Sequence, residues 1–121
     1  MSILVGRKAP SFSSQAVLES GEIVGDFDFQ SKINGKYAVL FFYPLDFTFV
    51  CPSEILAMAS RTAELNKLGC EVVAVSVDSH HSHFAYRNTA VNDGGIGPVP
   101  FSLVADMSRE ISQAYGVVAE S

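Results

Sequence analysis

Apolar and polar positions divide this chain into short segments with either strand or helix periodicity. The apolar run 37–43 and the nearly all apolar run 70–77 predict buried strands. The second is rich in β-branched residues that suit an interior parallel position. A third, shorter strand is predicted at 101–104. After residue 36 the order strand, helix, strand, helix, strand, helix is typical of an α/β domain with a largely parallel central sheet flanked by helices.

Residues 55–68 carry the clearest helical pattern in the chain. Pro52 suits a first helical position because it has no N–H group to leave unpaired, and Gly69 suits the end of the helix. One face repeats at helical spacing and is expected to pack on the sheet: Ile55, Met58, Ala59, Thr62 and Leu65.

The other segments are assigned from turn and capping signals. Residues 13–17 and 22–29 predict an irregular hairpin, and the Asn-Gly pair within 31–36 predicts a turn. Asp78 or Ser79 is expected to cap a helix that runs to Asn88, and residues 92–100 predict a loop. A last helix is expected from a cap at Asp106 or Ser108 to Tyr115, with a further strand beginning at Val117-Val118.

Composition and charge narrow the possible functions. The chain is 48% hydrophobic and 17% charged, so residues 1–121 are expected to form a single globular domain. A formal net charge of −5 without a basic run argues against nucleic-acid binding. No stretch approaches the ~18 apolar residues of a membrane span, and the amino terminus lacks the pattern of a signal peptide. Two cysteines do not make a secreted disulfide framework, so we expect a cytoplasmic protein.

Cys51 is the strongest candidate for chemistry. It stands directly before Pro52, where a loop is predicted to end and a helix to begin. The free N–H groups and the dipole of a helix start stabilise a thiolate, so its pKa falls and the reactive form is favoured. Thr48 lies three residues earlier, where its hydroxyl can reach the sulfur or a small oxygen-containing substrate. The alternative is that Cys51 is a small core residue, as we expect for Cys70.

Three histidines in four positions, His80, His81 and His83, raise the question of a metal site. On a helix, His80 and His83 would share one face. A structural zinc normally takes four ligands, and no further Cys or His completes the set. We therefore expect no metal here.

The run Pro44-x-x-x-Thr48-x-x-Cys51 is the signature of the peroxiredoxins. The fuller stretch 42–52 resembles the typical two-cysteine branch, the alkyl hydroperoxide reductase C type. Shorter similarities lie at 5–12, at 76–80 and at Gly94-Gly95-Ile96-Gly97, a motif of members prone to over-oxidation. The resemblance implies a thioredoxin-like fold.

The resemblance also implies a reaction. The Cys51 thiolate would attack hydrogen peroxide or an alkyl hydroperoxide and become sulfenic acid. Pro44 would shield the pocket from water, Thr48 would hold the peroxide in line, and Glu54 would pair with an arginine that organises the pocket. Sulfur does the redox chemistry, so no metal, haem or flavin cofactor is expected. The implied partners are a thioredoxin-like or flavoprotein reductant and further subunits, in a homodimer or decamer.

The resemblance covers only the first two thirds of a typical member. The family's arginine at the reactive sulfur and its resolving cysteine come later, and none of the chain's arginines stands at the matching position: Arg7, Arg61, Arg87 and Arg109. The chain is thus expected to be truncated. Two rival functions remain open: a non-catalytic interaction module or chaperone-like holdase, and thioredoxin-like disulfide exchange, which the lack of a Cys-x-x-Cys pair disfavours.

Overall fold

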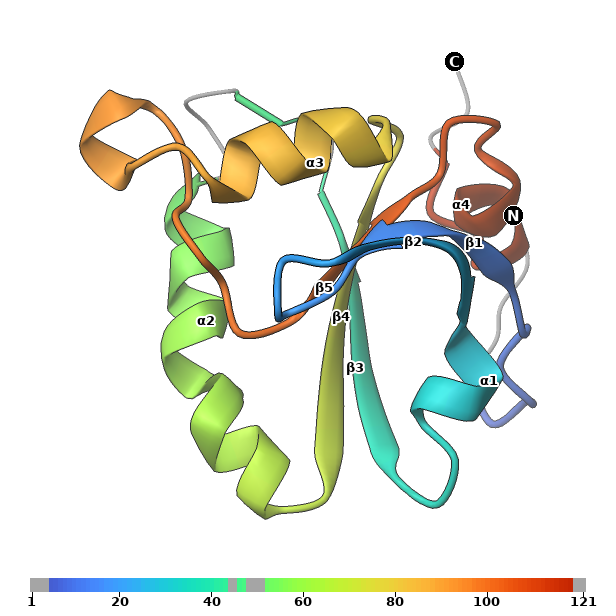
Figure 1. Ribbon diagram of the computed structural model, residues 1–121. Helices are drawn as coiled ribbons and strands as arrows, with labels where there is room; N and C mark the ends of the chain where they lie inside the picture. The colour runs from blue at the N-terminus through green and yellow to red at the C-terminus, as the bar shows by residue number, and fades with distance from the viewer. Residues whose placement is uncertain (1–4, 44–45, 48–51, 119–121) are drawn as a thin grey trace.

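A five-stranded sheet forms the centre of the fold (Figure 1). The computed structural model describes residues 5–43, 46–47 and 52–118. Along the chain the elements are β1 Ser13–Val17, β2 Ile23–Asp28, α1 Phe29–Lys32, β3 Tyr37–Phe42, α2 Pro52–Lys67, β4 Cys70–Ser76, α3 His80–Arg87, a 3-10 turn Val91–Asp93, β5 Ser102–Ala105 and α4 Glu110–Ala114.

The strand order is β2-β1-β5-β4-β3. β4 pairs in parallel with β3, with Leu40 opposite Val73, and in parallel with β5, with Val75 opposite Val104. β1 is antiparallel to both β2 and β5, with an irregularity between Ser14 and Ala16. The predicted parallel core and the irregular hairpin are therefore confirmed, but the hairpin joins the same sheet and makes it mixed.

The two faces of the sheet are covered by different helices. Alternate residues of a strand point to opposite faces, and β4 is apolar at both sets of positions. Val72 and Ala74 pack with Ile55 of α2 and Tyr86 of α3 on one face. Val73, Val75 and Val104 pack on the other face, with Phe29 of α1 and Ile111 of α4. Figure 1 shows this division, with α2 and α3 on one side of the strands and α1 and α4 on the other.

The long helix α2 has the predicted inner face. Ile55 and Thr62 are fully buried, and Met58, Ala59 and Leu65 pack against the same apolar cluster. The helix begins at Pro52, as the missing N–H of proline suggests. Gly69 follows it with a φ of 77°, a left-handed conformation that glycine adopts without steric cost.

The turn expected at Asn34-Gly35 is present, but helix α1 was not predicted, and the strand expected at Val117-Val118 is wrong. The segment after β2 forms the four-residue helix α1, because the Asp28 carboxylate accepts from the N–H of Gln30 and starts a turn of helix. Val117 and Val118 do not continue as a strand; the N–H of Val117 instead bonds to the carbonyl of Ser112 and closes α4.

The glycine-rich loop at 92–100 has a packing role that explains part of its composition. At Gly95 a Cβ atom would lie 2.1 Å from the carbonyl oxygen of Thr89, so only glycine fits. The N–H groups of Gly95 and Gly97 bond to the carbonyls of Ala90 and Thr89. This loop is thereby packed closely onto the end of α3.

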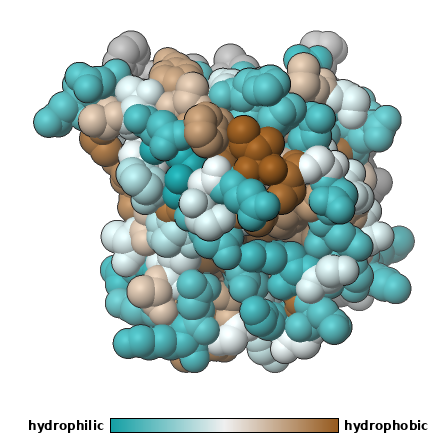
Figure 2. Space-filling model, viewed as in Figure 1, coloured by the Kyte–Doolittle hydropathy of each residue, from teal (hydrophilic) through white to brown (hydrophobic). Residues whose placement is uncertain are grey.

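The face seen in Figure 2 is largely hydrophilic, with one compact hydrophobic area near its centre. Within the described part of the chain, none of the helices is long and apolar enough to cross a membrane. The buried apolar side chains form two clusters, one between each face of the sheet and the helices that cover it.

Parallel pairing brings three strand ends to one edge of the sheet. β3, β4 and β5 all run toward this edge, and α2 starts there at Pro52. In open α/β sheets the carboxyl edge is the usual place for a binding site.

Leu103 tests the central packing. This residue of β5 is fully buried in the apolar cluster that lies on the α2 side of the sheet. Leu68, by contrast, is 76% exposed. Leu103→Ala is expected to lower the free energy of unfolding by about 2–5 kcal/mol, because it removes buried methyl groups and leaves a cavity. Leu68→Ala, the matched control, should change it by no more than about 0.5 kcal/mol. Urea unfolding measures both; equal losses would contradict this description of the core.

Candidate functional site

In the sequence, the predicted reactive residues come between the end of β3 and the start of α2. Pro44, Thr48 and Cys51 are outside the described residues, so their side chains are not placed here. Glu54 is described: it is exposed in the first turn of α2, where a carboxylate is favoured by the helix dipole. The described residues next to these positions in the chain are Tyr43, Asp46, Phe47 and the first turn of α2.

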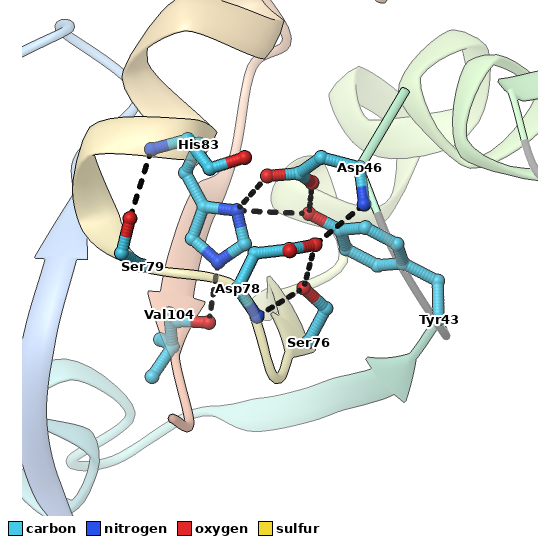
Figure 3. A network of polar contacts seen from close by, with 8 residues as sticks. Tyr43, Asp46, Ser76, Asp78, Ser79, His83 and Val104 are labelled. Carbon is cyan, nitrogen blue, oxygen red and sulfur yellow. Dashed lines mark hydrogen bonds and ion pairs between the residues drawn. The ribbon is translucent and has the colours of Figure 1, made fainter. Parts of the chain in front are cut away.

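Asp46 is at the centre of a buried polar network (Figure 3). The Tyr43 hydroxyl donates to Asp46 Oδ1 over 2.6 Å, and Asp46 Oδ2 lies 2.8 Å from His83 Nδ1. The side chains of Asp46 and His83 are both fully buried. Residues from the end of β3, from the following loop and from α3 therefore meet in one contact.

The backbone of Asp46 is held as well as its side chain. Its N–H donates to Asp78 Oδ2 over 2.5 Å. The same Asp78 oxygen accepts from the Ser76 hydroxyl at 3.2 Å, and the Asp78 N–H donates to Ser76 Oγ at 3.3 Å. The loop after β3 is thus fastened to the loop after β4.

His83 connects this network to β5. Its Nε2 lies 2.9 Å from the carbonyl oxygen of Val104, which only accepts hydrogen bonds, so Nε2 carries a proton. Its Nδ1 lies 2.8 Å from Asp46 Oδ2 and 3.2 Å from the hydroxyl oxygen of Tyr43. Both ring nitrogens are satisfied, as burial requires.

The Tyr43 hydroxyl stays protonated under ordinary conditions. Burial raises its pKa well above the usual value, and the nearby charge of Asp46 and the hydrogen bond to it raise the pKa further. Tyr43 is therefore a permanent donor to Asp46 at neutral pH.

Phe47 shows that the backbone is constrained directly after Asp46. Its φ is 59°, a left-handed conformation that costs a bulky residue roughly 1–2 kcal/mol. Its ring packs on Tyr86 of α3, with centroids 4.8 Å apart. The contacts of Asp46 and Phe47 together hold this conformation, one residue before Thr48.

An open hollow of about 530 Å³ lies beside Tyr43, on the α4 side of the same edge. It is lined by Phe42, Tyr43, Ser76, Val77, Arg109, Ser112, Val117 and Val118. Arg109 is the charged residue of this lining. The Asp106 carboxylate fixes the neighbouring start of α4 by accepting from the N–H groups of Ile111 and Ser112. Ser108 also accepts from the N–H of Glu110, at 3.4 Å, so both residues that the sequence offered bond to the start of α4, whose N-cap position is Arg109.

The three histidines do not come together around a common point. His83 turns into the core, where its nitrogens are used by Asp46 and Val104, while His80 lies nearer the surface, with Nδ1 2.9 Å from Gln15 Oε1. Among the residues that the structure describes, no group of three His, Cys, Asp or Glu side chains is arranged to hold a metal ion. Ser79 caps α3 as predicted, accepting from the N–H of Ser82.

Cys70 lies at the opposite edge of the sheet. It opens β4, is half-buried, and its thiol is 3.7 Å from the carbonyl of Glu71. Helix α2 separates Cys70 from Pro52, and its 16 residues span about 24 Å. A disulfide requires Cα atoms closer than about 7 Å. Cys70 is therefore far from the start of α2.

Sequence reasoning missed the network of Asp46, His83 and Tyr43. In the sequence, His83 stands out only as a possible metal ligand, and Asp46 is one position within the stretch 42–52. A signal was present: polar residues follow each of the strands β3 and β4, and parallel strands bring such residues to one edge.

Tyr43→Phe tests the network. The change removes the donor to a buried carboxylate, so the free energy of unfolding at neutral pH should fall by about 1–3 kcal/mol. The folded state holds the phenolic proton more tightly than the unfolded chain does, so the free energy of unfolding of the wild type decreases as the pH rises above about 10. In Tyr43→Phe the contribution of this group to that decrease should be absent. Urea unfolding at several pH values measures both. Tyr37, 81% exposed, gives the control: an equal effect of Tyr37→Phe would contradict the assignment.

Comparison with known proteins agrees with the motif. The profile of the AhpC/TSA family matches residues 5–121. A peroxiredoxin of Cynops pyrrhogaster is 48% identical over 120 residues, covering 96% of this chain and 57% of that protein. Peroxiredoxin-2 of Bos taurus is 50% identical over 118 residues, with the same two coverages. The chain thus spans less than two thirds of the length of these relatives.

Solved structures agree with the fold. The reduced 2-Cys peroxiredoxin of Plasmodium vivax superposes with a TM-score of 0.90 at 38% identity, covering 98% of this chain and 61% of that one. The AhpC of Enterococcus faecalis gives a TM-score of 0.82 at 35% identity, covering 93% and 64%. These matches confirm the thioredoxin-like α/β fold and the resemblance to two-cysteine peroxiredoxins. The chain is a member of the AhpC/TSA family.

Proposed function

We propose that this chain carries the peroxide-reducing site of a thiol-dependent peroxidase, with Cys51 as the nucleophile. The observation that carries the proposal is the family match across residues 5–121, which includes the Pro44, Thr48 and Cys51 motif. The described surroundings support it: α2 begins directly after Cys51, at the carboxyl edge of three parallel strands. A thiol beside a helix start is favoured as thiolate.

The proposed step is a two-electron transfer to sulfur. The Cys51 thiolate attacks one oxygen of the peroxide, an S–O bond forms and the O–O bond breaks. The departing oxygen takes a proton and leaves as water or an alcohol, while Cys51 becomes a sulfenic acid. Hydrogen peroxide and alkyl hydroperoxides are the proposed substrates, and no bound cofactor enters this step.

The other motif residues serve Cys51 in the proposal. Thr48 holds the peroxide in line with the sulfur, which is a positioning role. Pro44 shields the site from water. Glu54, in the first turn of α2, pairs with an arginine that orders the site.

The sulfenic acid must be resolved by a thiol other than Cys70. Cys70 stands at the far end of α2, about 24 Å from Pro52 by helix rise. A thiol from another subunit or another protein is therefore needed to form the disulfide, which a thioredoxin-like protein or a flavoprotein would then reduce. Cys70 is structural in this proposal.

Self-association and location complete the proposal. β3 is at the edge of the described sheet, and an open strand edge offers backbone groups to a partner. This supports assembly into a homodimer or decamer, in a reducing compartment such as the cytoplasm. Both core clusters share the one sheet, which supports treating residues 1–121 as a single domain.

The variants Cys51→Ser and Cys70→Ser show which of the two thiols reacts with peroxide. One equivalent of hydrogen peroxide should add a single oxygen to the reduced wild-type chain, or link two chains by a disulfide, because Cys51 is oxidised. Cys51→Ser should abolish both products, since the hydroxyl of serine is a far weaker nucleophile than a thiolate. Cys70→Ser, the matched control, should react like the wild type. Intact mass measured over minutes gives the result.

The same experiment decides between the peroxidase and its rival. An unchanged wild-type mass would leave the chain as an interaction module or holdase. Oxidation that disappears in Cys70→Ser and persists in Cys51→Ser would contradict the assignment of the nucleophile.

A further inference from the structure

Asp46 is fixed at three points, which is unusual for a loop residue. Its two carboxylate oxygens contact Tyr43 at 2.6 Å and His83 at 2.8 Å, and its N–H donates to Asp78 at 2.5 Å. These partners come from the end of β3, from α3 and from the loop after β4. Figure 3 shows them converging on Asp46 from different elements.

His83 has one nitrogen toward the scaffold and the other toward the loop. Its Nε2 bonds to the carbonyl of Val104 in β5, which is buried in the sheet, and its Nδ1 bonds to Asp46. The ring thereby holds the loop after β3 at a defined distance from β5. These two contacts can be removed separately, because they use different ring atoms.

Stability alone does not account for this pair. Apolar residues of similar volume often stabilise a protein as well as a buried ion pair does, whereas a buried pair with directional bonds defines one arrangement. Here the defined arrangement lies within the motif of residues 44–51, ahead of Thr48 in the sequence. Asp46 is two residues before Thr48 and five before Cys51, and Phe47 between them is held at a φ of 59°.

We propose that the buried Asp46–His83 pair positions the segment that carries Thr48 and Cys51, with His83 acting through Asp46. The proposal rests on the proposed peroxidase function and adds two positioning residues to it. Neither residue needs to touch the peroxide. The contact with Asp46 fixes where the segment leaves the scaffold, and a shift of about 1 Å in such a point lowers a rate as much as 100-fold.

Two substitutions of His83 distinguish an effect on the position of the loop after β3 from an effect on the stability of the fold. The side-chain amide of asparagine places a donor near the position of Nδ1, and that of glutamine places one near Nε2. His83→Asn therefore keeps the bond to Asp46 and gives up the bond to Val104. His83→Gln keeps the bond to Val104 and gives up the bond to Asp46. Each variant loses one buried hydrogen bond, so the pair is matched in cost to the fold.

The 121-residue chain and both variants are compared in two measurements. The first is the second-order rate constant for loss of the Cys51 thiol with hydrogen peroxide. His83→Gln should be on the order of 10- to 100-fold slower than wild type, whereas His83→Asn should stay within about threefold. The second is amide hydrogen exchange in the peptide 44–54, which should be faster in His83→Gln than in His83→Asn.

The outcomes separate this proposal from the proposed function. If the wild-type chain does not react with peroxide, the proposed function fails, and amide exchange alone decides the positioning role. Equal rates and equal exchange in the two His83 variants would overturn the positioning role, whether both match the wild type or both are impaired. Should His83→Gln not fold, Asp46→Ala replaces it, because alanine has no polar side-chain atom to contact His83 Nδ1. Faster exchange in 44–54 supports the proposal, and unchanged exchange overturns it.

Discussion

The buried contact between Asp46 and His83 is the constraint on which the carboxyl edge of this fold depends. Two ionisable side chains fully removed from water are tolerated only when their hydrogen bonds are completed. Here the Tyr43 hydroxyl, the carbonyl of Val104 and the contact between Asp46 Oδ2 and His83 Nδ1 complete them. Because the partners come from β3, α3 and β5, the contact forms only when these elements are in register.

The sheet topology explains why these residues meet. Parallel pairing of β3, β4 and β5 brings the loops after all three strands to one edge, where α2 also begins. A thiol placed at that helix start has the helix dipole to favour the thiolate. The AhpC/TSA family match spans the strands, the polar network and the motif alike.

The sequence predicted what depends on local pattern. The apolar runs of β3 and β4 and the inner face of α2 follow from periodicity. The assignment of Cys51 as the nucleophile comes from a motif and stays a prediction, because Cys51 lies outside the described residues. Periodicity could not predict that β1 pairs with β5, because Ala16 and Val104 are 88 positions apart along the chain. For the same reason the bond between Asp46 and His83 was missed. Helix α1 was missed because it depends on one capping carboxylate rather than on an apolar face.

The measurement that tests the central claim most directly is a double-mutant cycle between Asp46 and His83. The rate constant of Cys51 with hydrogen peroxide is measured for the wild type, Asp46→Ala, His83→Gln and the double variant. If the two residues act as one positioning unit, the double variant should be no slower than the slower single variant, because the second change removes nothing further. Independent effects, in which the two losses multiply, would contradict the account.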